Sequence, residues 1–161
     1  MPNSPKRPVV LLAEDSEDDA FFFGWTLEKY GLECELVRAN DGAEAVAVLK
    51  GGRKDTDGRE PVRPDLVFLD LKMPAMTGFE VLQWIRDNPF NPPLDVAVLS
   101  GSEHAIDVAR AKALGATGYY VKPLSVQHLR ARFDAWREKH DPAAAAGGAA
   151  ISGSVPAGQN P

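Results

Sequence analysis

The sequence predicts an α/β fold: a doubly wound, five-stranded parallel sheet with helices on both faces. Four short apolar runs, at residues 9–13, 66–69, 96–99 and 119–121, indicate strands that are buried on both faces, as in parallel sheets. Segments with helix signals alternate with the strands, which predicts βαβ units with right-handed crossovers. The length of 161 residues is that of a single domain.

The first two elements are a strand over 8–13 and a helix over 18–30. The strand is apolar until an acidic pair ends it. Ser16 or Asp18 is placed to cap the helix, and Gly31 to stop it.

Three consecutive phenylalanines in this helix cannot all face one core, so at least one of them must be exposed or meet a partner. We expect the apolar face of the helix to include Phe22, with Trp25 or Thr26, and Leu27 or Tyr30.

A second strand is predicted over 34–38 and a short helix over 43–50, with a turn at Asp41-Gly42 between them. Cys34 is the only cysteine, which excludes an intramolecular disulfide and a cysteine-based metal site. We expect it to be a small buried hydrophobic residue. Residues 51–64 are polar and have no periodicity, which predicts a loop.

The third strand is predicted over 65–70 and the third helix over 77–87. Thr77 and Glu80 have the spacing of a capping box at the start of this helix. The proline-rich segment 88–93 then interrupts regular structure.

The fourth strand and helix are predicted over 95–99 and 103–114, with Gly115 as the stop. The fifth strand follows over 117–121, and the last helix over 125–140. Within that helix, residues 129, 133 and 136 share one face, which predicts core packing against the sheet, with a homodimer seam as the alternative.

The two ends of the chain differ in composition from the rest. Residues 1–7 are expected to form a flexible arm, and 141–161, rich in alanine, glycine, serine and proline, a disordered tail. We expect a single-domain cytoplasmic protein without a signal peptide, a spanning helix or an output domain. The net charge of −5 argues against a general nucleic-acid binder.

Polar residues directly follow four of the predicted strands. Glu14-Asp15, Asp70, Ser100 and Lys122 each come after an apolar run. Because ligand sites of parallel sheets lie beyond the carboxyl ends of the strands, we expect these side chains to gather at one edge. Carboxylates, a hydroxyl and an ammonium suit a divalent cation and a phosphoryl group.

The motifs resemble the receiver domain of bacterial two-component response regulators over roughly 8–139, and we expect the domain itself to span 8–140. The resemblance is carried, in the expected order, by Glu14-Asp15, Asp70-Leu71-Lys72-Met73-Pro74 with Gly78, Ser100-Gly101, and Gly118-Tyr119-Tyr120-Val121-Lys122-Pro123. It implies a flavodoxin-like sheet with strand order 2-1-3-4-5.

The resemblance also implies a role for each site residue. Asp70 would be the phosphoacceptor. Asp15 would bind Mg²⁺ with Glu14 close by, and Asp70 and the backbone carbonyl of Lys72 would complete the ligands. Acidic residues that follow a strand can also serve as helix N-caps, and this is the alternative role for Asp18 or Asp19.

Further roles concern switching and phosphate lifetime. Lys122, aimed by a cis peptide before Pro123, would pair with Asp70 and the phosphoryl oxygens, and Ser100 would donate its hydroxyl to the phosphoryl group. Tyr119 matches the switch aromatic, while Tyr120 competes for that role, and alternation along the strand puts one of the two in the core and one outside. Lys72 and Ser102 would flank the attacking water and tune lifetime. His104, one turn into a helix, is expected to be an ordinary surface residue.

The implied function is to accept a phosphoryl group from a phosphohistidine of a sensor histidine kinase. Phosphorylation would remodel the surface of the fourth helix, fifth strand and fifth helix, which would bind a downstream protein or a histidine phosphotransfer protein, or form a homodimer. The loop at 51–64 hints at a phytochrome-like kinase. The protein would catalyse only its own phosphorylation and dephosphorylation.

Two other functional classes share part of this pattern. A haloacid dehalogenase-type hydrolase needs a second aspartate at position 72, where this chain has Lys72. A pseudo-receiver, which binds partners but is never phosphorylated, is the remaining alternative.

Overall fold

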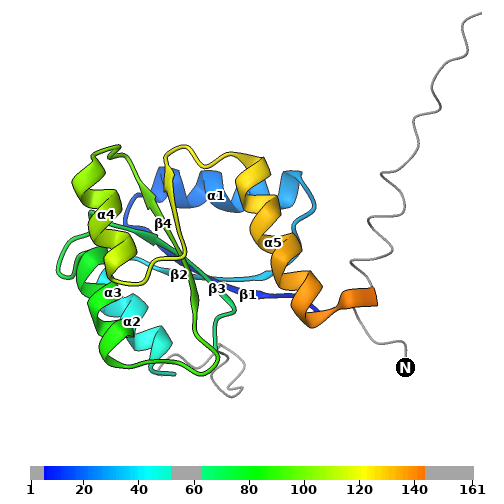
Figure 1. Ribbon diagram of the computed structural model, residues 1–161. Coiled ribbons are helices and arrows are strands. Elements are labelled where there is room, and N and C mark those ends of the chain that lie inside the picture. The colour runs from blue at the N-terminus through cyan, green and yellow to red at the C-terminus, as the bar shows by residue number, and fades with distance from the viewer. Residues whose placement is uncertain (1–5, 52–62, 144–161) are drawn as a thin grey trace, which may run out of the picture.

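A computed structural model describes residues 6–51 and 63–143 of the chain. Five parallel strands form one sheet in the order β2-β1-β3-β4-β5, which confirms the predicted fold class and strand order. Figure 1 shows the sheet between its helices. Most of the predicted arm, loop and tail (1–7, 51–64 and 141–161) lies outside the described residues. The strands are β1 (Val9–Ala13), β2 (Glu35–Ala39), β3 (Leu66–Asp70), β4 (Asp95–Ser100) and β5 (Gly118–Val121).

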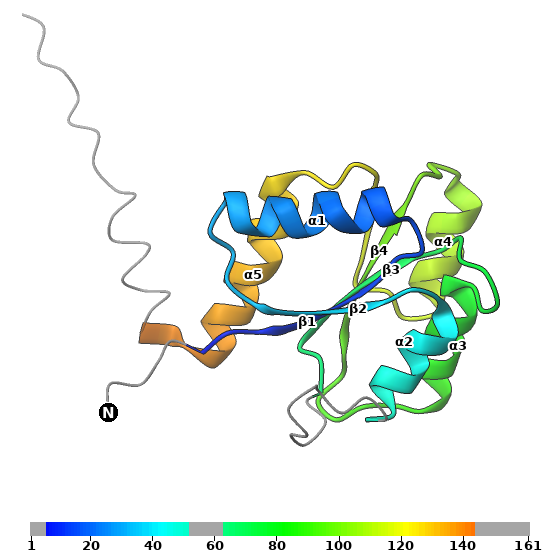
Figure 2. The same ribbon diagram turned by 180° about the vertical axis from the view of Figure 1, so that it is seen from behind.

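Five helices connect and cover these strands. α1 and α5 lie on one face of the sheet, and α2, α3 and α4 on the other, as the two opposite views show (Figures 1 and 2). Every strand and helix agrees with its predicted bounds to within two residues, and none of the described helices has the length and apolar character to cross a membrane. The helices are α1 (Glu17–Lys29), α2 (Gly42–Leu49), α3 (Gly78–Asp87), α4 (Ala105–Ala113) and α5 (Val126–His140).

The strands alternate their side chains between two hydrophobic cores, one on each face. Leu11, Val67 and Val98 belong to the core under α2–α4. The core under α1 and α5 contains all three residues of the predicted apolar face of α5, Leu129, Phe133 and Trp136, which confirms core packing and removes these side chains from any dimer seam.

The predicted apolar face of α1 was wrong at one position. Phe23 is buried, whereas Phe22 is 48% and Phe21 75% exposed. Ala20 and Leu27 are buried with Phe23, and their three- and four-residue spacing puts all three on one face of the helix. Two of the three phenylalanines are therefore exposed, which confirms that they cannot share one core.

The prediction that only one of the two tyrosines of β5 enters the core was also wrong. Tyr119 packs against the core under α2–α4 and Tyr120 against the core under α1 and α5, so both are partly buried. Because helices cover both faces of the sheet, successive side chains along β5 point alternately into the two cores and not alternately into a core and the solvent.

Cys34 is half-buried, not buried as predicted, because it lies beside the edge strand β2. Its burial still raises the pKa of the thiol to about 11.

Candidate functional site

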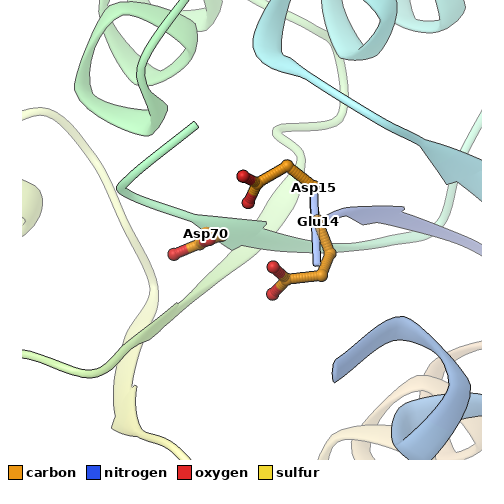
Figure 3. A group of neighbouring side chains, drawn as sticks. All are labelled: Glu14, Asp15 and Asp70. Atoms are coloured by element: carbon orange, nitrogen blue, oxygen red, sulfur yellow. The ribbon is translucent and has the colours of Figure 1, made fainter. Parts of the chain in front are cut away.

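The predicted carboxylates meet at the carboxyl ends of β1 and β3. Glu14 and Asp15 directly follow β1, and Asp70 is the last residue of β3. Figure 3 shows the three side chains extending toward the same space. One oxygen from each carboxylate lies within 4.8 Å of the others. Oxygen donors at this spacing fit a hard cation such as Mg²⁺.

Lys122 joins this group from the residue after β5. Its Nζ lies 2.6 Å from Glu14 Oε2 and 3.5 Å from Asp70 Oδ2, so the predicted pairing with Asp70 is present. A third ion pair, 3.0 Å to Asp19 Oδ2, was not predicted. The expected cis peptide between Lys122 and Pro123 is also present.

Asp19 was considered only as a helix cap, but Ser16 caps α1, since its side chain accepts a hydrogen bond from the Asp19 N–H. Asp19 lies in the first turn of α1, so its side chain is free to reach Lys122. Sequence reasoning missed this contact because nothing in the spacing relates residue 19 to residue 122.

Burial dominates the electrostatics of the site. Glu14 and Asp70 are only 2% and 6% exposed, and loss of water raises the pKa of both carboxyl groups, although Lys122 opposes the rise. Burial alone would lower the pKa of Lys122, but its bonds to Glu14 and Asp19 outweigh burial and raise it. The lysine is therefore firmly charged, and the two buried acids hold protons more readily than exposed ones.

The backbone after β3 fixes Asp70. The Lys72 N–H donates to Asp70 Oδ1 at 3.3 Å, and the Gly78 N–H donates to the Leu71 carbonyl at 3.0 Å. A Cβ at Gly78 would lie 2.2 Å from the Asp70 carbonyl oxygen, so only glycine fits this approach of α3 to β3. The capping box predicted for Thr77 and Glu80 is formed.

The loop between β4 and α4 is organised around Ser102. The Ser102 N–H donates to Ser100 Oγ at 3.0 Å, and the Tyr119 hydroxyl donates to the Ser102 carbonyl at 2.8 Å. Ser100 and Ser102 are both buried. His104 is exposed, as predicted, but it is the N-cap residue of α4 and does not lie one turn inside the helix. Ser100, predicted to face the phosphoryl group, is thus linked to the predicted switch aromatic through one residue.

The family model for the response regulator receiver domain matches residues 10–134. The chain belongs to this family. The match begins within β1 and ends within α5, and it includes every residue of the site.

Known receiver proteins share both sequence and structure with this chain. The response regulator Rcp1 of Synechocystis sp. is 33% identical over 127 residues, which is 79% of this chain and 83% of Rcp1. A solved bacteriophytochrome response regulator, AtBRR, aligns with a TM-score of 0.67 and 32% identity over 78% of this chain and 89% of that one.

Two further solved structures are a phosphorylated cyanobacterial phytochrome response regulator, RcpA, and the Mn²⁺-bound form of Rcp1. RcpA aligns with a TM-score of 0.66 and 28% identity over 83% of this chain and 93% of that chain. The Mn²⁺-bound form of Rcp1 aligns with a TM-score of 0.63 and 30% identity over 81% of this chain and 92% of that chain.

Some relatives are much longer than this chain. It is 32% identical over 124 residues to a probable cyclic di-GMP phosphodiesterase of Vibrio cholerae, a match that covers 77% of this chain and 25% of the relative. The similarity to that relative is therefore confined to a receiver domain and does not extend to the rest of the phosphodiesterase.

Proposed function

We propose that this receiver domain accepts a phosphoryl group on Asp70 from a phosphohistidine of a sensor histidine kinase. The position of Asp70 carries the proposal: it ends a buried strand, next to two further carboxylates and 3.5 Å from the ammonium of Lys122. An Asp70 oxygen forms a bond to phosphorus as the bond from phosphorus to the imidazole nitrogen breaks, and that nitrogen keeps the electron pair.

Glu14, Asp15, Asp70 and the backbone carbonyl of Lys72 would hold Mg²⁺. The donor set fits this ion, because three carboxylate oxygens lie close together and Mg²⁺ is usually bound by one or two carboxylates with water and phosphate. The bound ion would neutralise charge on the transferring phosphoryl group. Lys122 would add its positive charge to the phosphoryl oxygens from the β5 side.

Ser100 and Tyr119 would convert phosphorylation into a change of surface. Ser100 would donate a hydrogen bond from its hydroxyl to the phosphoryl group. The loop after Ser100 would move with it, because Ser102 is hydrogen-bonded to both Ser100 and Tyr119. The remodelled surface would be that of α4, β5 and α5. Lys72 and Ser102, on either side of the site, would tune the lifetime of the phosphorylated state.

The surface of α4, β5 and α5 would bind a downstream protein or a histidine phosphotransfer protein, or pair two copies of the chain. The similarity to phytochrome response regulators supports a phytochrome-like kinase as the phosphoryl source. The chain would act in the cytoplasm and would catalyse only its own phosphorylation and dephosphorylation.

The proposal is tested by intact-protein mass spectrometry after incubation with phosphoramidate or acetyl phosphate, with and without Mg²⁺. The wild type is expected to gain one hydroxylamine-labile phosphoryl group only with Mg²⁺. The Asp70→Asn variant should gain none, whereas Asp134→Asn, a matched change at an exposed position of α5, should behave as wild type. No gain in the wild type would overturn the proposal and support the pseudo-receiver alternative.

A further inference from the structure

Ser102 has polar contacts on every one of its hydrogen-bonding groups. Its N–H donates a hydrogen bond to Ser100 Oγ, and its carbonyl oxygen accepts one from the Tyr119 hydroxyl. Its own hydroxyl donates to Asp107 Oδ2 at 2.7 Å. The same hydroxyl oxygen accepts the His104 N–H at 3.2 Å. Ser102 is 7% exposed, so these contacts are shielded from water.

Asp107 provides the only contact among these that comes from within α4. It lies in the first turn of the helix, where an acid commonly reaches back to the N-cap residue. The N-cap here is His104, whose side chain makes no capping bond, and the Asp107 carboxylate extends past it to Ser102. The start of α4 is thus attached to the loop through Asp107 and Ser102.

The consequence for Ser100 follows from the chemistry of a hydroxyl group. Ser100 Oγ accepts the Ser102 N–H, and a hydroxyl has one proton and two acceptor sites. Among the described residues, nothing accepts the proton of Ser100. The loop therefore engages the oxygen of Ser100 and leaves its single proton available at the edge of the sheet where Asp70 lies.

We propose that Asp107 is a positioning residue for phosphorylation of Asp70: by anchoring Ser102, it holds the Ser100 hydroxyl with its proton directed to the phosphoryl group. This inference rests on the proposed function, because it needs a phosphoryl group at Asp70. Hydrogen-bond donors that are fixed before reaction stabilise developing charge without reorganisation. Among the described residues, the hydrogen bond of Asp107 is to Ser102, and none joins it to Lys122 or to the proposed metal ligands.

The test measures the rate of phosphorylation by phosphoramidate at varied Mg²⁺. Asp107→Ala is expected to lower the maximal rate by about fivefold, the factor associated with one ordinary hydrogen bond. The Mg²⁺ concentration for half-maximal rate should not change, because no ligand is altered. Asp107→Asn keeps an oxygen that can accept the Ser102 hydroxyl, so it should retain most of the wild-type rate.

Two controls separate positioning from charge and from folding. Glu103→Ala removes a negative charge from an exposed position in the same loop and should leave the rate unchanged. In a Ser100→Ala background, Asp107→Ala should have no further effect, because it acts through the hydroxyl that is missing. If Asp107→Ala does not fold, Ser102→Ala, which removes the other half of the bond, replaces it in the same cycle.

The outcomes are distinct. Additive losses in the Ser100→Ala background, or an equal loss in Glu103→Ala, would overturn the role of Asp107 while the proposed function stands. A wild type that takes up no phosphoryl group would overturn the proposed function and this inference together.

Discussion

Gly78 is the position where a single methyl group should do the most damage to the site. The Cβ of an alanine there would lie 2.2 Å from the Asp70 carbonyl oxygen and 2.8 Å from the Leu71 Cα. Both are backbone atoms, so no side-chain rotation can relieve the contact. Real Cβ atoms do not approach other atoms within 3.0 Å, so α3 and the end of β3 must separate by about 0.8 Å.

The cost of Gly78→Ala can be worked from this contact. Overpacking costs about 1–3 kcal/mol, and a rigid backbone contact belongs at the upper end of that range. Alanine has less conformational freedom than glycine in the unfolded chain, and this offsets about 0.4–1 kcal/mol of that cost. The net loss in the free energy of unfolding is therefore about 2 kcal/mol, which lowers the Tm of a chain of this length by about 4–8 °C.

Thermal melts followed by circular dichroism, with urea titrations, measure this loss. Gly101→Ala is the matched control, because its Cβ would meet nothing within 4 Å, and its Tm should lie close to that of the wild type. The Asp70 carbonyl is the atom displaced, so Gly78→Ala should also slow phosphorylation at temperatures where it remains folded. A Gly78→Ala protein that melts within about 1 °C of Gly101→Ala would refute the reasoning.

Three further predictions concern the charges and the thiol. The raised pKa values of Glu14 and Asp70 mean that the folded state binds protons more tightly, so without divalent cations their stability contribution is present below about pH 4 and is lost as pH rises through the folded pKa values. Without Mg²⁺, Glu14→Gln should therefore have a higher Tm than the wild type at pH 7.5, and this difference in Tm should shrink as the pH is lowered toward 4. A difference in Tm that does not change with pH would contradict this. Lys122→Met should leave those two acids without their cation, so its Tm should fall at pH 7.5 and recover as pH is lowered, whereas Lys112→Met, at an exposed position of α4, should not show this pattern. Because burial raises the pKa of Cys34 to about 11, iodoacetamide at pH 8 should alkylate the folded protein about 100-fold more slowly than the urea-unfolded protein by mass spectrometry, and equal rates would disprove the shift.

The positions that sequence predicted well are those set by chain direction alone. In a parallel sheet every strand ends at the same edge, so residues that end or directly follow β1, β3, β4 and β5 must come together whatever their side chains do. That argument brought Glu14, Asp70 and Lys122 into contact from the sequence. The capping box at Thr77 succeeded for a similar reason, since its two residues lie three positions apart.

The positions that were not predicted from the sequence depend on which neighbouring element covers each side of a helix or strand. Phe23 is the buried phenylalanine of α1 and shares its face with Ala20, a small residue that carries little weight in a hydrophobic pattern. Both tyrosines of β5 are partly buried because α5 covers one side of the sheet and α4 the other. The hydrogen bond between Lys122 and Asp19 follows from the placement of α1 beside the residue after β5, and no local spacing relates residues so far apart in the chain.

The charge balance of the site links its stability to its proposed chemistry. Lys122 forms ion pairs with Glu14, Asp19 and Asp70, and Asp15 adds a fourth carboxylate beside Glu14 and Asp70, so these five side chains have a net negative charge when all are ionised. Protons and a divalent cation are alternative ways to reduce this repulsion, and burial, with a smaller contribution from the neighbouring carboxylates, raises the pKa of both Glu14 and Asp70. A carboxyl group must be ionised to bind a cation, so the affinity for Mg²⁺ should rise with pH as the two buried carboxyl groups lose their protons. A nucleophilic Asp70 has to be ionised, so the same cation that neutralises the phosphoryl group would also keep the acceptor in its reactive form.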